Sequence, residues 1–367
     1  MKRFIFSAIA LLTAATACTE SGIIETPDSY GNPIVFDTYI GKTPITKAVD
    51  MNGNLLQDKA QGNGVRIYAF TLPKTQWKAD QVDYDFPYMD GALFYESGWG
   101  YYPKTESGFK AAIEDVYWPG WGTDLAFVAY SLNVDASKYI SGDKTQFTFT
   151  VQDKVSEQVD LLVSPLTFVK EETGETPVNL QLYHLLSRIG FKVLATPGTS
   201  TDITINSVRL CGAFPETGTV NLMSATNAPG APKSVPSIEA NTSGTIQSYY
   251  DLLDKSANEK FSINSSECDG TAITDAAPIF GNVSTTQENR YMMIMPGLVS
   301  NASIEVEYKL GTQSQAHTAR IDLGETYFKA GSAYEFIFKV ATASIEFSGV
   351  VEGEWDEQAP VEHPLQK

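Results

Sequence analysis

The thiol of Cys18 is the side chain whose surroundings point most directly to a chemical step. It follows the basic start Met1-Lys2-Arg3 and an apolar run over residues 4–17 that ends in small residues. This order is typical of an export signal whose cleavage leaves a cysteine for lipid attachment. The run is too short to remain as a helix across a bilayer. We therefore predict a signal peptide over residues 1–17 and a lipid on Cys18; ordinary signal cleavage and an incidental cysteine are the alternatives.

The histidines and the other cysteines lack the spacing that catalysis or metal binding needs. His184, His317 and His363 lie far apart without a metal-ligand partner nearby in sequence, which favours structural or surface roles. Cys211 and Cys268 are too few for a disulfide scaffold, and they either pair outside the cell or are small buried residues. The sequence contains no serine-hydrolase, zinc-protease or phosphate-loop motif. We expect no enzyme activity, no metal and no cofactor.

An acidic stretch offers carboxylates at close spacing. Asp80, Asp83, Asp85 and Asp90 could supply oxygen ligands to calcium, but Pro87 interrupts them and the EF-hand spacing is absent. A solvated hairpin loop is therefore the favoured interpretation.

Aromatic residues concentrate in the first half of the chain, where they could form a platform on which sugar rings stack. Several occupy alternating positions, which favours the interior of a sheet protein over an exposed platform. The candidates are Trp77, Tyr84, Tyr88, Trp99, Tyr101, Tyr102 and Trp121.

Composition indicates a large, acidic, globular protein. The chain has 367 residues, is 43% hydrophobic and carries a formal charge of −18. Its length suggests two domains, and its acidity disfavours nucleic acid and anionic membrane surfaces as partners. A polar stretch at residues 171–177 suggests where one domain ends.

Alternation of apolar and polar residues predicts strands along most of the chain, separated by turn-rich segments. Many short strands of this kind favour antiparallel β-sandwiches. Helix is expected to be minor, at Phe109 to Val116 and Ser248 to Ser256. The clearest strands are residues 65–70, 146–151, 203–210, 303–310 and 334–340.

Several of these segments, taken in order, resemble one known family. They include DLLVS at residues 160–164, VNLQLYHLLSRIGFKV at 178–193, TINSVRLCGAFPETGTVNL at 204–222, RYMMIMPGLVSNASIEVEY at 290–308 and FKAGSAYEFIFKV ending at 340, with YWPGWGTDLAFVAYS at 117–131 and SIEFSGVVEGEW at 344–355. Together with the lipoprotein signal, the chain from about residue 34 to 355 is similar to fimbrillins, the lipoprotein-derived subunits of type V pili.

The resemblance implies an all-β fold of two tandem transthyretin-like antiparallel β-sandwich domains with minor helix. After the signal peptide and a lipid tether over residues 18–33, we place these domains at residues 34–172 and 173–367. It also implies export to the outer membrane, a lipid anchor there, and cleavage by an arginine- or lysine-specific protease. The subunit would then lose its first strand and join other pilus subunits by donor-strand exchange.

The residues of the first strand can be examined against this mechanism. Ile34, Phe36, Thr38 and Ile40 alternate on one face, as a half-buried strand requires. Removal of such a strand would open an apolar groove, which a neighbouring subunit's strand could fill. We place the cut between Lys47 and Ala48; Lys42 and Lys59 are alternative cut sites, and an uncleaved anchor subunit is the other possibility.

A donor strand is expected near the end of the chain, within residues 343–355. Ile345, Phe347 and Val350 alternate there imperfectly around Gly349, a pattern that a β-bulge would explain.

A second class of function stays open, that of a monomeric cell-surface glycan-binding lipoprotein. A host glycan or protein ligand is compatible with either class. Stalk, tip and anchor roles are equally open.

Overall fold

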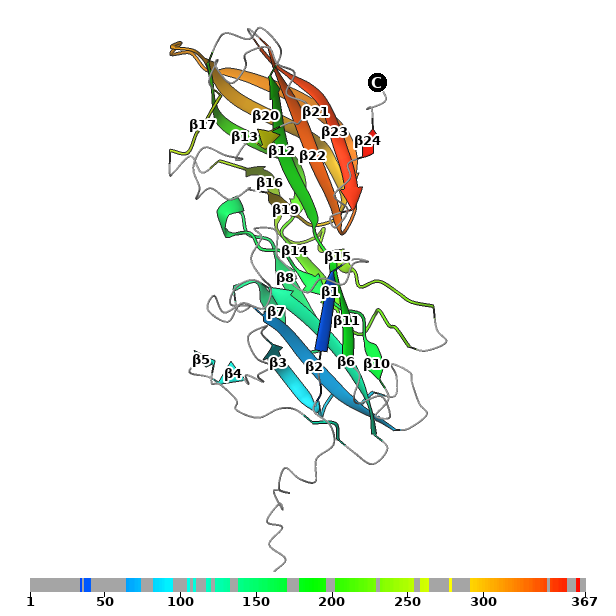
Figure 1. The fold of residues 1–367 in the computed structure, drawn as a ribbon. Coiled ribbons are helices and arrows are strands. Elements are labelled where there is room, and N and C mark those ends of the chain that lie inside the picture. Colours follow the sequence, from blue (N-terminus) through cyan, green and yellow to red (C-terminus); the bar gives the residue numbers. More distant parts are fainter. Residues whose placement is uncertain are drawn as a thin grey trace, which may run out of the picture.

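The computed structural model describes residues 34, 36–40, 64–73, 82–94, 104–105, 108–109, 117–119, 123–132, 138–169, 178–195, 202–228, 232–253, 258–263, 277–278, 291–341, 344–354 and 361–363. In these residues the ordered elements are strands, apart from one short 3-10 helix, η5, at Val155–Glu157. Figure 1 shows them in an elongated body with two groups of sheets stacked end to end. No helix in the described ranges is long and apolar enough to cross a membrane.

The first sheet belongs to the lower group in Figure 1 and has the strand order β1-β11-β9-β6-β2-β3, with β10 also paired to β6. Its strands are β1 (Phe36–Ile40), β2 (Gly64–Pro73), β3 (Met89–Phe94), β6 (Thr123–Leu132), β9 (Leu162–Val163), β10 (Thr167–Val169) and β11 (Val178–His184). Val65, Ile67 and Ala69 of β2 face one side of this sheet, and Phe70 and Leu72 face the other. The sheet therefore buries apolar side chains on both faces.

A four-stranded sheet completes the lower sandwich, in the order β15-β14-β8-β7. Its strands are β7 (Ile140–Gly142), β8 (Gln146–Thr150), β14 (Thr217–Asn221) and β15 (Ile238–Ala240), while β4 (Lys104–Thr105) and β5 (Gly108–Phe109) form a separate pair. Phe147 of β8 packs on Tyr130 of β6 with ring centroids 5.3 Å apart. This contact joins the two layers across the core.

The upper sandwich consists of a six-stranded and a five-stranded sheet. The first has the order β18-β12-β22-β23-β24, with β19 paired to β12, and the second has the order β16-β13-β20-β21, with β17 paired to β13. Tyr308 links the layers, because its hydroxyl accepts a hydrogen bond from the backbone N–H of Ile345 at 3.4 Å. The strands are β12 (Ser187–Ala195), β13 (Ile203–Pro215), β16 (Ile246–Asp251), β17 (Phe261–Ile263), β18 (Ala277–Pro278), β19 (Met292–Ile294), β20 (Gly297–Leu310), β21 (His317–Phe328), β22 (Ser332–Ala341), β23 (Ser344–Glu354) and β24 (Val361–His363).

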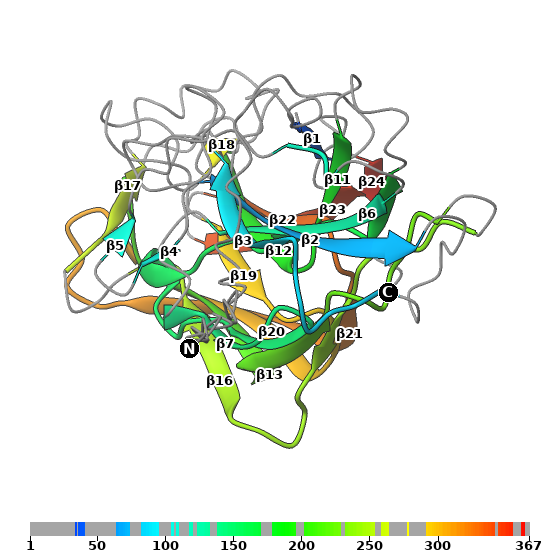
Figure 2. The ribbon, with the colours of Figure 1, turned by 90° about the horizontal axis from the view of Figure 1, so that it is seen from below.

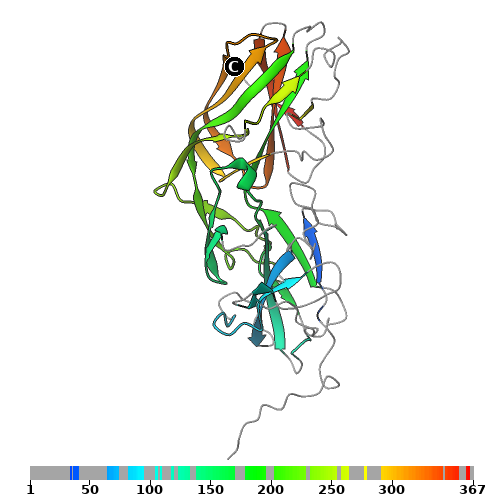
Figure 3. The ribbon, with the colours of Figure 1, turned by 90° about the vertical axis from the view of Figure 1, so that its left-hand side faces the viewer.

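Most ladders are antiparallel, but β1 pairs in parallel with β11 and β12 in parallel with β22. Viewed from below in Figure 2 and from the side in Figure 3, β1 lies on the opposite side of the body from β20 and its neighbours. The sheet edges formed by β1 and β21 therefore lie on different sides of the molecule.

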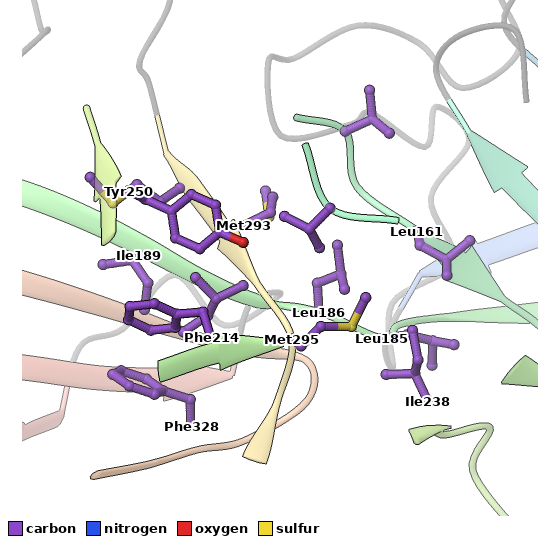
Figure 4. Close-up of a cluster of buried hydrophobic side chains, with 14 of the residues drawn as sticks. Leu161, Leu185, Leu186, Ile189, Phe214, Ile238, Tyr250, Met293, Met295 and Phe328 are labelled. Atoms are coloured by element: carbon purple, nitrogen blue, oxygen red, sulfur yellow. The ribbon is translucent and has the colours of Figure 1, made fainter. Parts of the chain in front are cut away.

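The two sandwiches share one continuous apolar core. Figure 4 shows the part of it that contains Leu161, Leu185 and Leu186 together with Met293 and Met295. The side-chain oxygen of Gln158 accepts a hydrogen bond from the N–H of Met293 at 2.7 Å, so polar contacts cross the same region. Burial of a common core couples the two sandwiches, because separating them would expose apolar surface to water.

Sheet membership does not follow the order of the chain. β11, β14 and β15 come after residue 173, yet they belong to the lower sandwich with strands that come before it. The chain crosses from the lower to the upper sandwich between β11 and β12, and it returns to the lower sandwich between β13 and β14. The predicted division at residues 172 and 173 stays a prediction.

The all-β prediction is confirmed, and each of the five clearest predicted strands coincides with an observed one. The expected helix at Ser248 to Ser256 is wrong, since Ile246–Asp251 forms strand β16. Most of the expected helix at Phe109 to Val116 lies outside the described residues.

Candidate functional site: the groove of the first strand

Strand β1 occupies the end of the lower sheet, where it runs parallel to β11. Phe36 lies opposite Val178, Thr38 opposite Leu180 and Ile40 opposite Leu182 in the ladder. Ile34 and Phe36 are 5% and 1% exposed. The predicted alternation therefore does bury its first two members on one face of the strand.

The face of the sheet that receives Phe36 is a compact apolar surface. The ring of Phe36 meets Phe127 of β6 edge to face, with centroids 5.4 Å apart. The ring of Trp118 also meets Phe127 edge to face, with centroids 6.0 Å apart. Such edge-to-face pairs add specific stabilisation to the burial of area. The cluster consists of Ile34, Phe36, Val65, Ile67, Ala69, Met89, Trp118, Leu125, Phe127, Ala129, Leu162, Val178, Leu180 and Leu182.

The groove is lined by the apolar side chains of this cluster. Its polar atom of note is Nε1 of Trp118, which is buried and finds no acceptor within the described part of the chain. Shape and apolar contact are what such a lining can recognise.

The ladder pattern shows that β1 fills this groove along the edge of β11. Val178 to Leu182 of β11 pair with β1, whereas β9 on the other side of β11 pairs with Tyr183 and His184. Loss of β1 would open the ladder along five residues of β11 and uncover the face on which Phe36 lies. The site can therefore bind an extended apolar segment by β-augmentation.

The sequence model of the family described as fimbrillin-like matches residues 46–355. The chain belongs to this family. The match covers most of the two sandwiches; β1 precedes it and β24 follows it. No curated protein sequence matches the chain.

Solved structures similar to this fimbrillin-like chain include a putative cell adhesion protein from Bacteroides uniformis. It is 15% identical with a TM-score of 0.45, and the match covers 90% of this chain and 100% of that one. The tip fimbrial protein Mfa3 from Porphyromonas gingivalis, with a C-terminal truncation, is 8% identical with a TM-score of 0.37; the match covers 84% of this chain and 97% of that one. A fimbrial assembly protein from Parabacteroides distasonis is 10% identical with a TM-score of 0.33, and the match covers 90% of this chain and 100% of that one.

The residues expected for processing fall outside the described part of the fimbrillin-like chain. These are Cys18, Lys47 and Ala48, together with the alternative cut sites Lys42 and Lys59. Lipidation at Cys18 and cleavage after Lys47 therefore stay predictions.

The expected donor residues lie in β23, which is fully built into the upper sandwich. β23 pairs with β22 from Ser344 to Glu354 and with β24 on its other side. Ile345 is 6% exposed, and Phe347 and Val350 pack against the core. The ladder shifts by one residue between the partners Phe347 and Gly349, so the irregular alternation is a bulge, as expected.

Of the seven candidate aromatic residues the structure describes two, Tyr84, which is half-buried and packs against the core, and Tyr88, which is 37% exposed. The ring of Tyr84 meets Phe70 edge to face at 5.0 Å, which fits the core interpretation, whereas the hydroxyl of Tyr88 donates a hydrogen bond to the carbonyl oxygen of Tyr117 at the surface. The other five candidates, Trp77, Trp99, Tyr101, Tyr102 and Trp121, lie outside the described residues.

The histidines and cysteines occupy separate places. His184 is buried and its Nδ1 lies 2.6 Å from Oδ2 of Asp160, while His317 stacks on Tyr308. Cys211 is a half-buried free thiol whose pKa is raised mainly by burial. In the described ranges no three His, Cys, Asp or Glu side chains gather as a metal site would require.

The groove contains residues that sequence reasoning did not assign to it. Val178, Leu180 and Leu182 alternate as clearly as β1 does, but nothing in a local pattern identifies a parallel partner so far along the chain. Trp118 was expected only as part of a family motif, and it lies beside Phe127 in the apolar cluster of the groove.

Proposed function

We propose that this fimbrillin-like chain is a structural subunit of a type V pilus, assembled by removal of β1 and entry of a strand from another subunit. It would be exported as a lipoprotein, held in the outer membrane through Cys18, and released into the fimbrium by cleavage after Lys47. Its partners would be other pilus subunits. The observation that carries the proposal is the position of β1, which completes the ladder of β11 and fills an apolar groove at a sheet edge.

The groove is energetically suited to exchange. Burying a large apolar side chain contributes about 1.5 to 3 kcal/mol, and Ile34 and Phe36 are two such residues. An emptied groove would lose this contribution together with the backbone bonds of five residue pairs. A donor with apolar residues at alternate positions restores both, because the strand period fixes which side chains enter the groove.

The donor is proposed to come from the end of the chain, at Ile345, Phe347 and Val350 or in the segment that follows. The structure sets different costs for these two sources. Release of β23 would break its ladder with β22 and expose Ile345. β24 is held to β23 by three residue pairs, so a donor taken from that segment leaves the upper sandwich intact.

N-terminal sequencing of the chain from native cells and from sheared fimbriae tests the proposal. We expect fimbriae to contain a chain that begins at Ala48, and we expect Lys47→Gln to keep β1 and abolish polymers. Lys59→Gln is the matched control and should polymerise normally. A chain that keeps β1 on the cell surface and never enters polymers would instead indicate an anchor subunit or a monomeric glycan-binding lipoprotein.

A further inference from the structure

Strand β21 is an exposed edge on the side of the molecule away from β1. It ends the five-stranded sheet and pairs with β20 alone among the described strands. β23 of the other layer approaches β21 without forming a ladder with it. Edge strands of this length present backbone donors and acceptors that a second chain can use.

The side chains of β21 separate into two kinds along the strand. Ala319, Ile321 and Leu323 are half-buried and pack against the core, whereas Arg320 and Asp322 are on the exposed face. Nε of Arg320 donates to Asp322 at 2.9 Å, and its Nη1 donates to Glu305 of β20 at 2.7 Å. These contacts hold the Arg320 side chain on the outer face of the sheet, close to the edge.

We propose that β21 docks a second copy of this chain, with the two β21 strands antiparallel about a twofold axis at Ile321. In this register Arg320 lies opposite Asp322 of the second copy, and Asp322 lies opposite its Arg320. Ala319 likewise lies opposite Leu323 of the second copy, so the inner face joins apolar side chains. Directly opposite residues of an antiparallel pair interact, and opposite charges there stabilise the pairing.

Charge selects this register over its neighbours. Moving the twofold axis to Arg320 would place the two arginines against each other, and moving it to Asp322 would do the same for the two aspartates. Like charges directly opposite each other destabilise a strand pair. Among the described edge strands, only β21 carries opposite charges two residues apart, so this self-complementarity belongs to one edge.

The backbone limits the contact to a short, closed pair. Leu323 is an extra residue in the ladder with β20, and Gly324 has a φ of +70°, in the left-handed region. A bulge there ends regular pairing, so about five residues from Ala319 to Leu323 form the new ladder. A twofold pair uses the β21 edge of both copies and cannot extend into a fibre. This lateral contact is independent of the proposed strand exchange at β1.

A single cysteine at the proposed axis tests the arrangement on the full chain in its producing cells. With Cys211 and Cys268 replaced by serine, Cys18 is the native cysteine that remains, and the same chain with Ile321 intact measures any cross-linking through it. Ile321→Cys then brings two thiols opposite each other, at the Cα separation of about 4.5 to 5.5 Å that a disulfide accepts. Mild oxidation should yield a disulfide-linked dimer. Thr318→Cys is the control: it is more exposed, but its two copies would be about 20 Å apart along the strands. Absence of the Ile321→Cys dimer, or equal cross-linking at Thr318→Cys, would overturn the proposal.

Charge exchange supplies a second test on the Ile321→Cys chain. Asp322→Arg alone and Arg320→Asp alone each create two like-charged pairs, and each should lower dimer yield by about tenfold or more. Produced together, the two variants are complementary and should restore cross-linking between unlike chains. This rescue also shows that both variants fold. Cross-linking that ignores these charges, or a mixture that stays uncross-linked, would contradict the register.

Discussion

Phe36→Ala should loosen the first strand, because Phe36 is the residue of β1 whose described side chain is buried in the groove. Phe36 is 1% exposed and its ring meets Phe127 edge to face at 5.4 Å. Truncating a buried phenylalanine to alanine costs about 3 to 5 kcal/mol, since apolar contacts are lost and a cavity remains. Because about 1.4 kcal/mol is tenfold in an equilibrium constant, the strand should dissociate from a nicked chain roughly a hundredfold to a few thousandfold more readily.

The assay follows the release of β1 after the peptide bond is cut. The chain is nicked by a lysine-specific protease, the nick near Lys47 is verified by mass, and the bound N-terminal peptide is quantified over time after gel filtration. The wild-type peptide should stay bound for long periods, and the Phe36→Ala peptide should leave quickly. Multimers should then appear sooner in the variant, because its groove is open to other strands.

Phe86→Ala is the matched control, since the same ring is removed from a side chain that is 77% exposed. This variant should release its strand at the wild-type rate. Equal retention of the peptide by Phe36→Ala and wild type would refute the argument that side-chain burial holds β1 in place. Equally fast release by both phenylalanine variants would show that the effect is general destabilisation.

Three further predictions concern stability and export. His184→Ala should lower the free energy of unfolding by about 1 to 3 kcal/mol in urea titrations, because it leaves a buried oxygen of Asp160 without its 2.6 Å partner; His317→Ala, on a more exposed ring, should cost less. Tyr250→Phe should raise that free energy by about 1 kcal/mol at neutral pH, since the Tyr250 hydroxyl is buried with no partner in the described ranges. Burial also raises the pKa of Tyr250 above its ordinary value of 10.0, so above pH 10 the hydroxyl ionises more readily in the unfolded chain than in the folded one. Wild type should therefore lose stability as the pH rises above 10, and Tyr250→Phe should lose less. Cys18→Ala should abolish labelling by a fatty-acid probe in producing cells, and a variant that still labels would rule out this thiol as the anchor.

The strands could be predicted from the sequence because their alternation is local. Val65 to Phe70 and Ile203 to Leu210 alternate between buried and less buried faces in the way that a strand in a sandwich demands. The same reasoning failed at Ser248 to Ser256. Pairing with β13 imposes a period of two there, which buries Tyr250 beside Phe214 and leaves Tyr249 41% exposed.

The candidate site was only partly predictable, for a physical reason. The alternation of Ile34 and Phe36 predicts a half-buried strand. The groove that receives them is formed by β6 and β11, whose pairing partners lie far away in the sequence. Ladders of that kind are fixed by the global fold and leave no signature in a short window. The shared core at Leu185, Leu186 and Met293 is hidden for the same reason, because each residue is apolar in a local pattern that fits either sandwich.

The arrangement of the two free edges gives the proposed assembly a consistent geometry. β1 and β21 belong to different sandwiches and lie on opposite sides of the body (Figures 2 and 3). Strand exchange at β1 therefore leaves β21 available, and a β21 pair leaves the groove of Phe36 open to a donor. Because the two sandwiches share a core, the β1 edge and the β21 edge keep a fixed orientation relative to each other. End-to-end growth through β1 and lateral pairing through β21 can then occur in the same subunit without competing for the same surface.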